Sequence, residues 1–246
     1  MAGAEQLNPL EQFEIHRLIP IEIGGVDVSF TNSSLWMVIA ITLVTLFLTL
    51  SVRRRALVPG RWQSLAELAY EFIANMIRDN VGQEGRRFFP FIFTLFMFIL
   101  FGNMLGLIPY SFTYTSHIIV TVTLALTVFL GITIVGIVRH GLRFFTFFMP
   151  QGAPIAMMPL MIPIEILSYL SRPVSLSIRL FANMMAGHTM MKVFAGFVVI
   201  LGLYGGWAPL LVDVALTGFE VLIAFLQAYV FTILTCLYLN DAIHLH

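Results

Sequence analysis

The chain has 246 residues, of which 59% are hydrophobic and 11% are charged, and its formal net charge is zero. Soluble domains carry roughly twice that share of charged residues, so the composition favours a membrane-embedded protein. The zero net charge excludes a global basic field that would attract nucleic acid. The single cysteine, Cys236, excludes an internal disulfide and a cysteine-based metal cluster.

Five apolar runs are long enough to cross a bilayer, which takes about 20 mostly apolar residues per helix. We therefore predict an all-α, polytopic membrane protein with a single membrane domain. An outer N-terminal segment covers 1–33. The predicted membrane helices are 35–52, 88–108, 118–138, 154–203 and 208–239.

A sixth helix is predicted over 62–81, between the first two membrane helices. Its apolar residues fall on one helical face, but charged residues interrupt the segment too often for a membrane span. These are Glu67, Glu71, Arg78 and Asp79. We interpret the segment as an amphipathic helix on the membrane surface, and a helix docked on the soluble part of the protein is the alternative.

The basic residues predict the orientation of the chain. Five alternating spans place nine arginines in the loops of one side, and Arg17 lies on the other. The nine are Arg53, Arg54, Arg55, Arg61, Arg78, Arg86, Arg87, Arg139 and Arg143. Because basic loops stay in the cytoplasm, we expect the amino terminus outside and the carboxyl terminus in the cytoplasm.

The last two predicted membrane helices are too long to cross the bilayer upright. A helix over 154–203 would measure ~75 Å, against ~30 Å of hydrocarbon. We therefore expect both helices to be steeply tilted. Pro159, Pro163 and Pro173 could each start or kink the first of the two.

Charged side chains lie within these two helices, where each costs at least ~2.5–3.5 kcal/mol at the bilayer centre. Such charges need a partner, water or a substrate. In the first helix one stripe lies within about 40° of a line down the helix. It consists of Glu165, Arg172, Ser175, Arg179 and Asn183, with His188 and Lys192 on roughly the opposite side. In the second helix Asp213, Glu220 and Gln227 recur every seven residues.

The depths of these residues can be compared if Arg179 and Gln227 are level near the midplane. His188 and Glu220 then lie ~13 Å and ~10 Å toward the outside, so they could be neighbours. Glu165 lies ~21 Å toward the inside. An outer group of Asn183, His188, Asp213 and Glu220 is thus separated from an inner group around Glu165 by one permanent cation. A proton path interrupted at its middle would have this arrangement.

Simpler interpretations remain open for the outer group. Glu220 could be half of a buried ion pair with Lys192. His188 could be a hydrogen-bonded interior histidine, and Asp213 could be a solvated residue at the outer mouth.

Arg172 and Arg179 differ in whether the sequence offers a partner for their charge. Arg172 could snorkel toward the inner surface or pair with Glu165. Arg179 has no carboxylate three or four residues away in its own helix, so we expect its partner to come from elsewhere.

Residues 171–188 read SRPVSLSIRLFANMMAGH, which resembles the signature of subunit a of F-type ATP synthases. FGNMLGLIP at 101–109 and FEVLIAFLQAY at 219–229 are similar to the same family. The resemblance implies that Arg179 is the essential arginine. It also assigns the proton path to Ser175, Asn183, His188, Glu220, Gln227 and Glu165, and our reading of the stripes adds Asp213.

The resemblance further implies a partner, a rotating c-ring whose small subunits each carry a membrane carboxylate. Two offset half-channels would serve that ring, with Arg179 preventing a direct leak, so that proton flow drives ATP synthesis. Peripheral-stalk b-type subunits, the rest of the F1F0 complex and the lipid bilayer are the other expected partners. No cofactor, metal or nucleic acid is expected, and no catalytic activity of the chain alone.

Some family members carry an acid where this chain has His188 and a histidine where it has Glu220. A pair that exchanges in this way preserves one proton-relaying contact, which supports the expected neighbourhood. The arrangement here is similar to mitochondrial members. We expect a bacterial inner membrane location, with the mitochondrial inner membrane as the alternative.

Two other functional classes remain open. A secondary transporter usually has repeated halves with broken helices in matching positions, and no such repeat is found. A membrane enzyme would need a nucleophile–base set or metal ligands, and the six histidines show no paired ligand spacing within one span. The chain also has no G-x-x-x-x-G-K loop, so ATP chemistry must lie on other subunits.

Overall fold

The computed structural model describes residues 13–23, 26–27, 29–53, 59–108, 111–141, 143–144 and 157–244. Five of the described helices are long and apolar enough to cross a membrane, which confirms the predicted all-α polytopic fold. The helices are α2 (Asn32–Val52), α3 (Arg61–Asn80), α4 (Phe89–Gly106), α5 (Ile118–His140), α6 (Met158–Gly205) and α7 (Trp207–Ile243), with 3-10 turns η2 (Gln83–Phe88) and η3 (Tyr114–Ser116). Arg54, Arg55, Pro109 and the first residues of the predicted span 154–203 lie outside the described residues.

The N-terminal segment contains short strands that the sequence did not predict. They are β1 (Arg17–Ile19), β2 (Glu22–Ile23), β3 (Val26–Asp27) and β4 (Phe30–Thr31). β1 pairs antiparallel with β4, and β2 pairs antiparallel with β3. The strands lead directly into α2, where the Thr31 side chain accepts a hydrogen bond from the Ser34 backbone N–H. This N-cap starts α2 at Asn32, three residues before the predicted start.

α3 forms where the amphipathic helix was predicted. It follows Pro59 and Gly60, and it packs against α2, α4 and α7. The second half of its apolar face is buried there, at Ile73, Met76 and Ile77. The first half, with Trp62, Leu65 and Leu68, is exposed, so packing accounts for only part of the apolar stripe.

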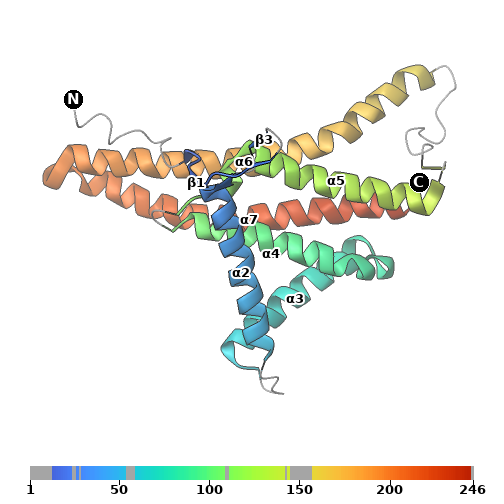
Figure 1. Cartoon of the computed structure of the whole chain (residues 1–246), viewed down its shortest axis with the longest axis horizontal. Helices are drawn as coiled ribbons and strands as arrows, with labels where there is room; N and C mark the ends of the chain where they lie inside the picture. Colours follow the sequence, from blue (N-terminus) through green and yellow to red (C-terminus); the bar gives the residue numbers. More distant parts are fainter. Residues whose placement is uncertain are drawn as a thin grey trace.

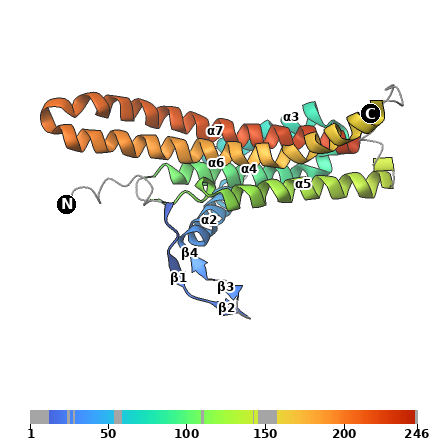
Figure 2. The same cartoon turned by 90° about the horizontal axis from the view of Figure 1, so that it is seen from above.

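α6 and α7 are the longest elements, with 48 and 37 residues. They lie side by side and antiparallel along the longest axis of the molecule, and α2 crosses this pair steeply (Figures 1 and 2). Pro159 lies in the first turn of α6, and Pro163 and Pro173 lie inside it. The α6 backbone departs from helical geometry only near its end, at Gly202.

One row of buried side chains orients α6. Leu176, Leu180 and Met184 recur every four residues and pack into the hydrophobic core, where α6 lies against α5 and α7. The neighbouring row, which contains Ser175, Arg179 and Asn183, is thereby turned to the outside. The core packing thus fixes the direction in which the arginine points.

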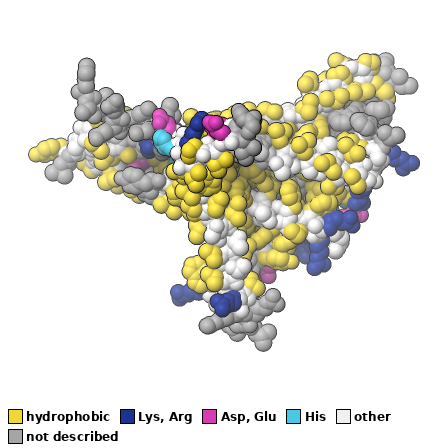
Figure 3. All heavy atoms as spheres, viewed as in Figure 1, with side chains coloured by type: hydrophobic (Ala, Val, Ile, Leu, Met, Phe, Trp, Pro, Cys, Tyr) yellow, Lys and Arg dark blue, Asp and Glu magenta, His cyan; other side chains and the backbone are white. Residues whose placement is uncertain are grey.

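The surface is apolar over most of its area, with basic side chains concentrated at a few places (Figure 3). They gather at the foot of α2 and near the ends of α3 and α5 (Figure 3). The described arginines of these segments and of η2 are Arg53, Arg61, Arg78, Arg86, Arg87 and Arg139. Arg139 forms an ion pair with Glu84, which joins the end of α5 to η2.

Candidate functional site

His188 and Glu220 meet in the interface between α6 and α7. The two side chains are almost fully buried, and His188 Nε2 lies 3.7 Å from Glu220 Oε1. Because the helices are antiparallel, His188 and Glu220 come level, and the expected neighbourhood is confirmed. The assumption that Arg179 and Gln227 are level is wrong by about one turn, because Gln227 pairs with Asn183. The alternative ion pair between Glu220 and Lys192 is not found in the described part of the chain, where Lys192 is exposed.

Gly187 has no side chain, and this leaves space against α6 for the Glu220 carboxyl group. A Cβ atom added at Gly187 would lie only 2.8 Å from Glu220 Cδ. A side chain at position 187 would therefore displace the Glu220 carboxyl group from its place against α6. Neither Glu220 oxygen has a hydrogen-bond partner among the described residues, and both are buried.

A polar run from the α4–α5 connection continues the site beyond His188. Thr113 Oγ1 lies 3.1 Å from His188 Nε2, and η3 packs against α6 directly after it. Buried polar atoms of Thr115, Ser116 and His117 have no partner within the described ranges and are available to water. Burial lowers the pKa of His117, so this imidazole is neutral at neutral pH.

A second contact between α6 and α7 lies nearer to Arg179. Asn183 Nδ2 donates to Gln227 Oε1 at 2.9 Å, and Gln227 is 3% exposed. Asn103 of α4 donates to the Ala224 carbonyl at 3.3 Å, one turn from Gln227. The seven-residue repeat of α7 therefore predicted the buried polar side of that helix, and Asn183 lies one turn from Arg179 on α6.

Arg179 differs from the residues around it because its side chain is exposed. Within the described ranges its guanidinium forms no ion pair and no hydrogen bond. Ser175 and Asn183 lie on the same exposed face, one turn to either side. A permanent cation thus faces outward from an apolar helix, and its expected partner is not supplied by the described part of this chain.

Arg172 has a different environment from the one its sequence alternatives suggested. Its Nη1 lies 3.0 Å from Asp241 Oδ2, and its guanidinium carbon lies 4.8 Å from the Tyr238 ring centroid and 5.4 Å from that of Tyr169. Asp241 of α7 is therefore its carboxylate partner, and not Glu165. The seven-residue spacing of Asp213, Glu220 and Gln227, continued by two steps, reaches Asp241 and could have identified it.

Two predicted path residues form no hydrogen bond or ion pair with this site among the described residues. Glu165 is partly exposed near the start of α6 and forms no ion pair within the described ranges. Asp213 is partly buried near the start of α7, and its Oδ1 has no partner among the described residues. The structure thus brings together His188, Glu220, Asn183 and Gln227. Asp213 lies two turns before Glu220 on α7, near enough for its charge to act on that carboxyl group, and Glu165 lies apart.

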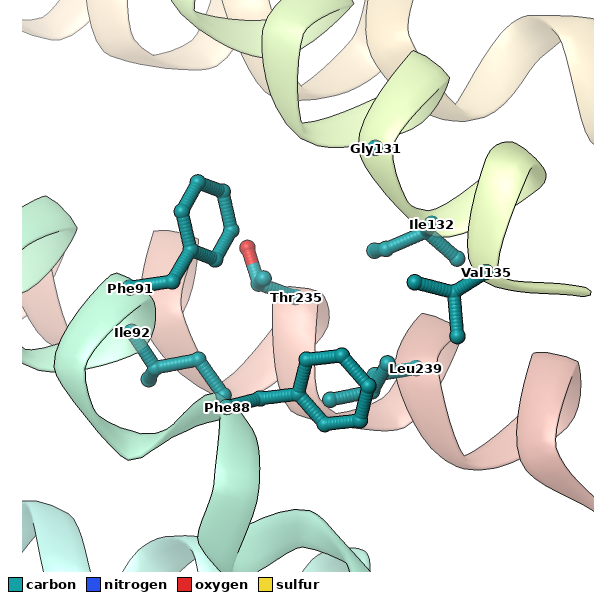
Figure 4. A pocket seen from close by; sticks show the side chains of 8 residues that line it. All are labelled: Phe88, Phe91, Ile92, Gly131, Ile132, Val135, Thr235 and Leu239. Carbon is teal, nitrogen blue, oxygen red and sulfur yellow. The ribbon is translucent and has the colours of Figure 1, made fainter. Parts of the chain in front are cut away.

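The remaining features of the described chain do not suggest small-molecule chemistry. No group of three or more His, Cys, Asp or Glu side chains among the described residues could hold a metal ion. A partly open gap of ≈ 130 Å³ lies between α4, α5 and α7, but its lining is apolar apart from the Thr235 hydroxyl (Figure 4). That hydroxyl already donates to the Phe231 carbonyl, so the gap offers no polar group for a ligand.

Comparison with known proteins places these residues in a family. The family described as ATP synthase A chain matches residues 34–240. The chain is 62% identical to ATP synthase subunit a of Paramagnetospirillum magneticum, over 97% of this chain and 99% of that protein. It is 59% identical to ATP synthase subunit a of Rhodospirillum rubrum and 58% identical to that of Pelagibacter ubique, in each case over 97% of this chain and at least 98% of the relative. The chain therefore belongs to the ATP synthase A chain family, as its signature segments indicated.

Proposed function

We propose that this chain is the proton-translocating stator subunit of the F0 sector of a rotary ATP synthase. Family membership and five membrane-length helices support a place in the membrane part of the F1F0 complex. The chain itself would carry out no catalysis. It would pass protons to and from the carboxylates of a c-ring, and the turning ring would couple this flow to ATP synthesis.

The observation that carries the proposal is the outward-facing Arg179 without a partner in the described chain. An arginine remains charged at any working pH, so it cannot relay a proton. Its charge would keep a ring carboxylate ionised while that carboxylate passes Arg179. An ionised carboxylate holds no proton, so no proton would be carried past this point. Arg179 would therefore separate two half-channels and prevent a direct leak.

The outer half-channel would run through the buried polar groups at the α6–α7 interface. Protons would enter through water near Asp213 and the α4–α5 connection, pass His188 and Glu220, and reach the ring near Asn183 and Gln227. The neutralised ring carboxylate could then turn into lipid, where a charged one would be too costly. After nearly a full turn it would release its proton toward Ser175 and Glu165 on the inner side.

The setting of this subunit follows from the same proposal. The ring would lie against the exposed face of α6 that contains Arg179. Peripheral-stalk b-type subunits would hold the chain, which forms a single membrane domain with α3 at the membrane surface. The chain would lie in a bacterial inner membrane, since the relatives described above are bacterial subunits. Its amino terminus would lie outside and its carboxyl terminus in the cytoplasm.

Proton flux through reconstituted F1F0 complexes tests the barrier directly. With Arg179→Ala we expect ATP-driven pumping into vesicles to be lost, since each proton that leaks back across 100 mV wastes about 2.3 kcal/mol. Arg179→Lys should recover little, because burial against the ring can remove the lysine proton.

Arg61→Ala is the matched control, because Arg61 is an exposed arginine at the start of α3, away from the long helices. It should pump at the unmodified rate with equal amounts of chain in the membrane. Full ATP-driven pumping by Arg179→Ala would refute the barrier role.

A further inference from the structure

We propose that Thr113 is a positioning residue that holds His188 in the tautomer with its hydrogen on Nε2. We further infer that the glycine-containing segment of α4, FGNMLG, serves to bring Thr113 to that place. The inference rests on the proposed function in one respect, that His188 belongs to the outer proton path. It assigns a role to the FGNMLG segment, which is not part of the proposed proton path.

The hydrogen-bond geometry of the threonine gives the first step. A hydroxyl has one hydrogen to donate and lone pairs with which to accept. The Thr113 hydroxyl donates to the Gly106 carbonyl at 3.3 Å. In the proposed arrangement its oxygen accepts a hydrogen bond from His188 Nε2, 3.1 Å away, and that nitrogen carries the hydrogen.

Glu220, the second neighbour of His188 Nε2, also favours the tautomer with the hydrogen on Nε2. Glu220 Oε1 lies 3.7 Å from His188 Nε2. A lone pair on Nε2 would face the lone pairs of both oxygens in a buried place, where electrostatic repulsion is poorly screened. A hydrogen on Nε2 is attracted to both. The Nδ1 atom is then the nitrogen that carries the lone pair.

The end of α4 determines where Thr113 lies. The Gly106 carbonyl belongs to the last turn of that helix and has no partner further along it. It accepts hydrogen bonds from Ser111 Oγ at 3.0 Å and from Thr113. A Cβ at Gly106 would overlap the Thr113 side chain, with its Cγ2 only 2.7 Å away, so glycine is required for this approach.

The residue after Thr113 anchors the same segment from the other side. The Tyr114 hydroxyl donates to the Phe98 carbonyl of α4 at 3.0 Å, and its ring is 1% exposed. Thr113 is therefore held between a helix end and a buried tyrosine, and it has little freedom to turn away from His188. Thr113 is itself 4% exposed.

The tautomer can be measured by ¹⁵N NMR on the full chain within its membrane complex, labelled with ¹⁵N-histidine. The signals of His188 are those that disappear in His188→Gln. We expect the unmodified chain to have the hydrogen on Nε2. Thr113→Val keeps the shape but removes the acceptor, and it should shift the population toward the Nδ1–H form.

Two further variants separate positioning from general damage. Thr113→Ser restores the hydroxyl and should restore the tautomer and the proton flux that Thr113→Val reduces. Thr121→Val is the control, because Thr121 is a buried threonine whose hydroxyl bonds only to the Ile118 carbonyl of its own helix. It should leave the His188 signals and the flux unchanged.

The failures of the two proposals can be told apart. An Nδ1–H imidazole in the unmodified chain, or an unaltered tautomer in Thr113→Val, would overturn the positioning role even if His188 is needed for transport. Normal pumping by His188→Gln would overturn the proposed proton path, and the NMR result would still decide the role of Thr113. If Thr113→Val does not assemble, Thr113→Ala also removes the acceptor and takes its place in the NMR measurement, where an unaltered tautomer would overturn the positioning role.

Discussion

The imidazole of His188 and the carboxyl group of Glu220 face each other in the interface between two antiparallel helices. His188→Glu alone would place two carboxyl groups side by side in a buried interface, where both cannot ionise. Glu220→His alone would remove the acid. We expect each single variant to lower ATP-driven proton pumping about tenfold or more, since a positioned proton-transfer group contributes ~10²–10⁴-fold in enzymes.

The double exchange, His188→Glu with Glu220→His, restores one acid and one imidazole at the same contact. It should pump several-fold faster than either single variant, measured by fluorescence quenching in vesicles with equal amounts of assembled complex. A double variant no better than the poorer single one would show that the two residues do not act as a pair.

The sequence predicted this contact because helical geometry alone determines it. Two antiparallel helices with polar residues at known spacings can be placed level once one pair is matched. Thr113 could not be found in the same way, because its contact with His188 joins residues 75 positions apart through a connection without periodicity. The partner of Arg172 was missed for a related reason, since Asp241 lies beyond the end of the predicted last span.

At the scale of elements, the apolar runs predicted the helices well because membrane-length segments have a strong compositional signal. The short strands β1 to β4 carry no such signal, since two or three residues are too few for alternation to be recognised. The burial of α3 against three helices was also beyond reach, because amphipathicity is the same for a helix packed on lipid and for one packed on protein.

The ion pair of Arg172 and Asp241 joins α6 to the last turn of α7. The two side chains are 19% and 36% exposed, so the pair lies between a buried and a surface ion pair. Breaking a buried pair costs about 3–5 kcal/mol, and exposed pairs contribute about 0.2–1 kcal/mol. We expect Asp241→Asn to destabilise the complex by about 1–2 kcal/mol, measured as a lower midpoint of thermal unfolding in detergent.

Replacing both members removes the unpaired charge as well as the pair. Arg172→Gln combined with Asp241→Asn should therefore lose less stability than the sum of the two single variants. Strictly additive losses would mean that the two side chains do not interact, and that the aromatic rings of Tyr169 and Tyr238 hold Arg172 without the carboxylate.

For the whole molecule, the steep crossing of α2 over the α6–α7 pair bears on how the chain lies in the membrane (Figure 1). α2 has 21 residues, or ~32 Å of helix, close to the ~30 Å of hydrocarbon, so it fits an upright crossing. α6 and α7 would measure ~72 and ~56 Å, and they fit only if they are strongly inclined. An inclined α6 presents a long face, including Arg179, to a curved partner such as a ring.

The orientation can be tested on single cysteine variants at Glu14, Gln83 and Tyr204, all of them exposed. The basic loops favour an outside amino terminus. An impermeant maleimide should therefore label Glu14→Cys and Tyr204→Cys from outside intact cells, and Gln83→Cys only in inverted vesicles. Cys236 is fully buried, so it should add little background. The opposite pattern would mean an inverted chain. Labelling of Glu14→Cys and Tyr204→Cys from different sides would mean an odd number of crossings between them, against the four that α2, α4, α5 and α6 provide.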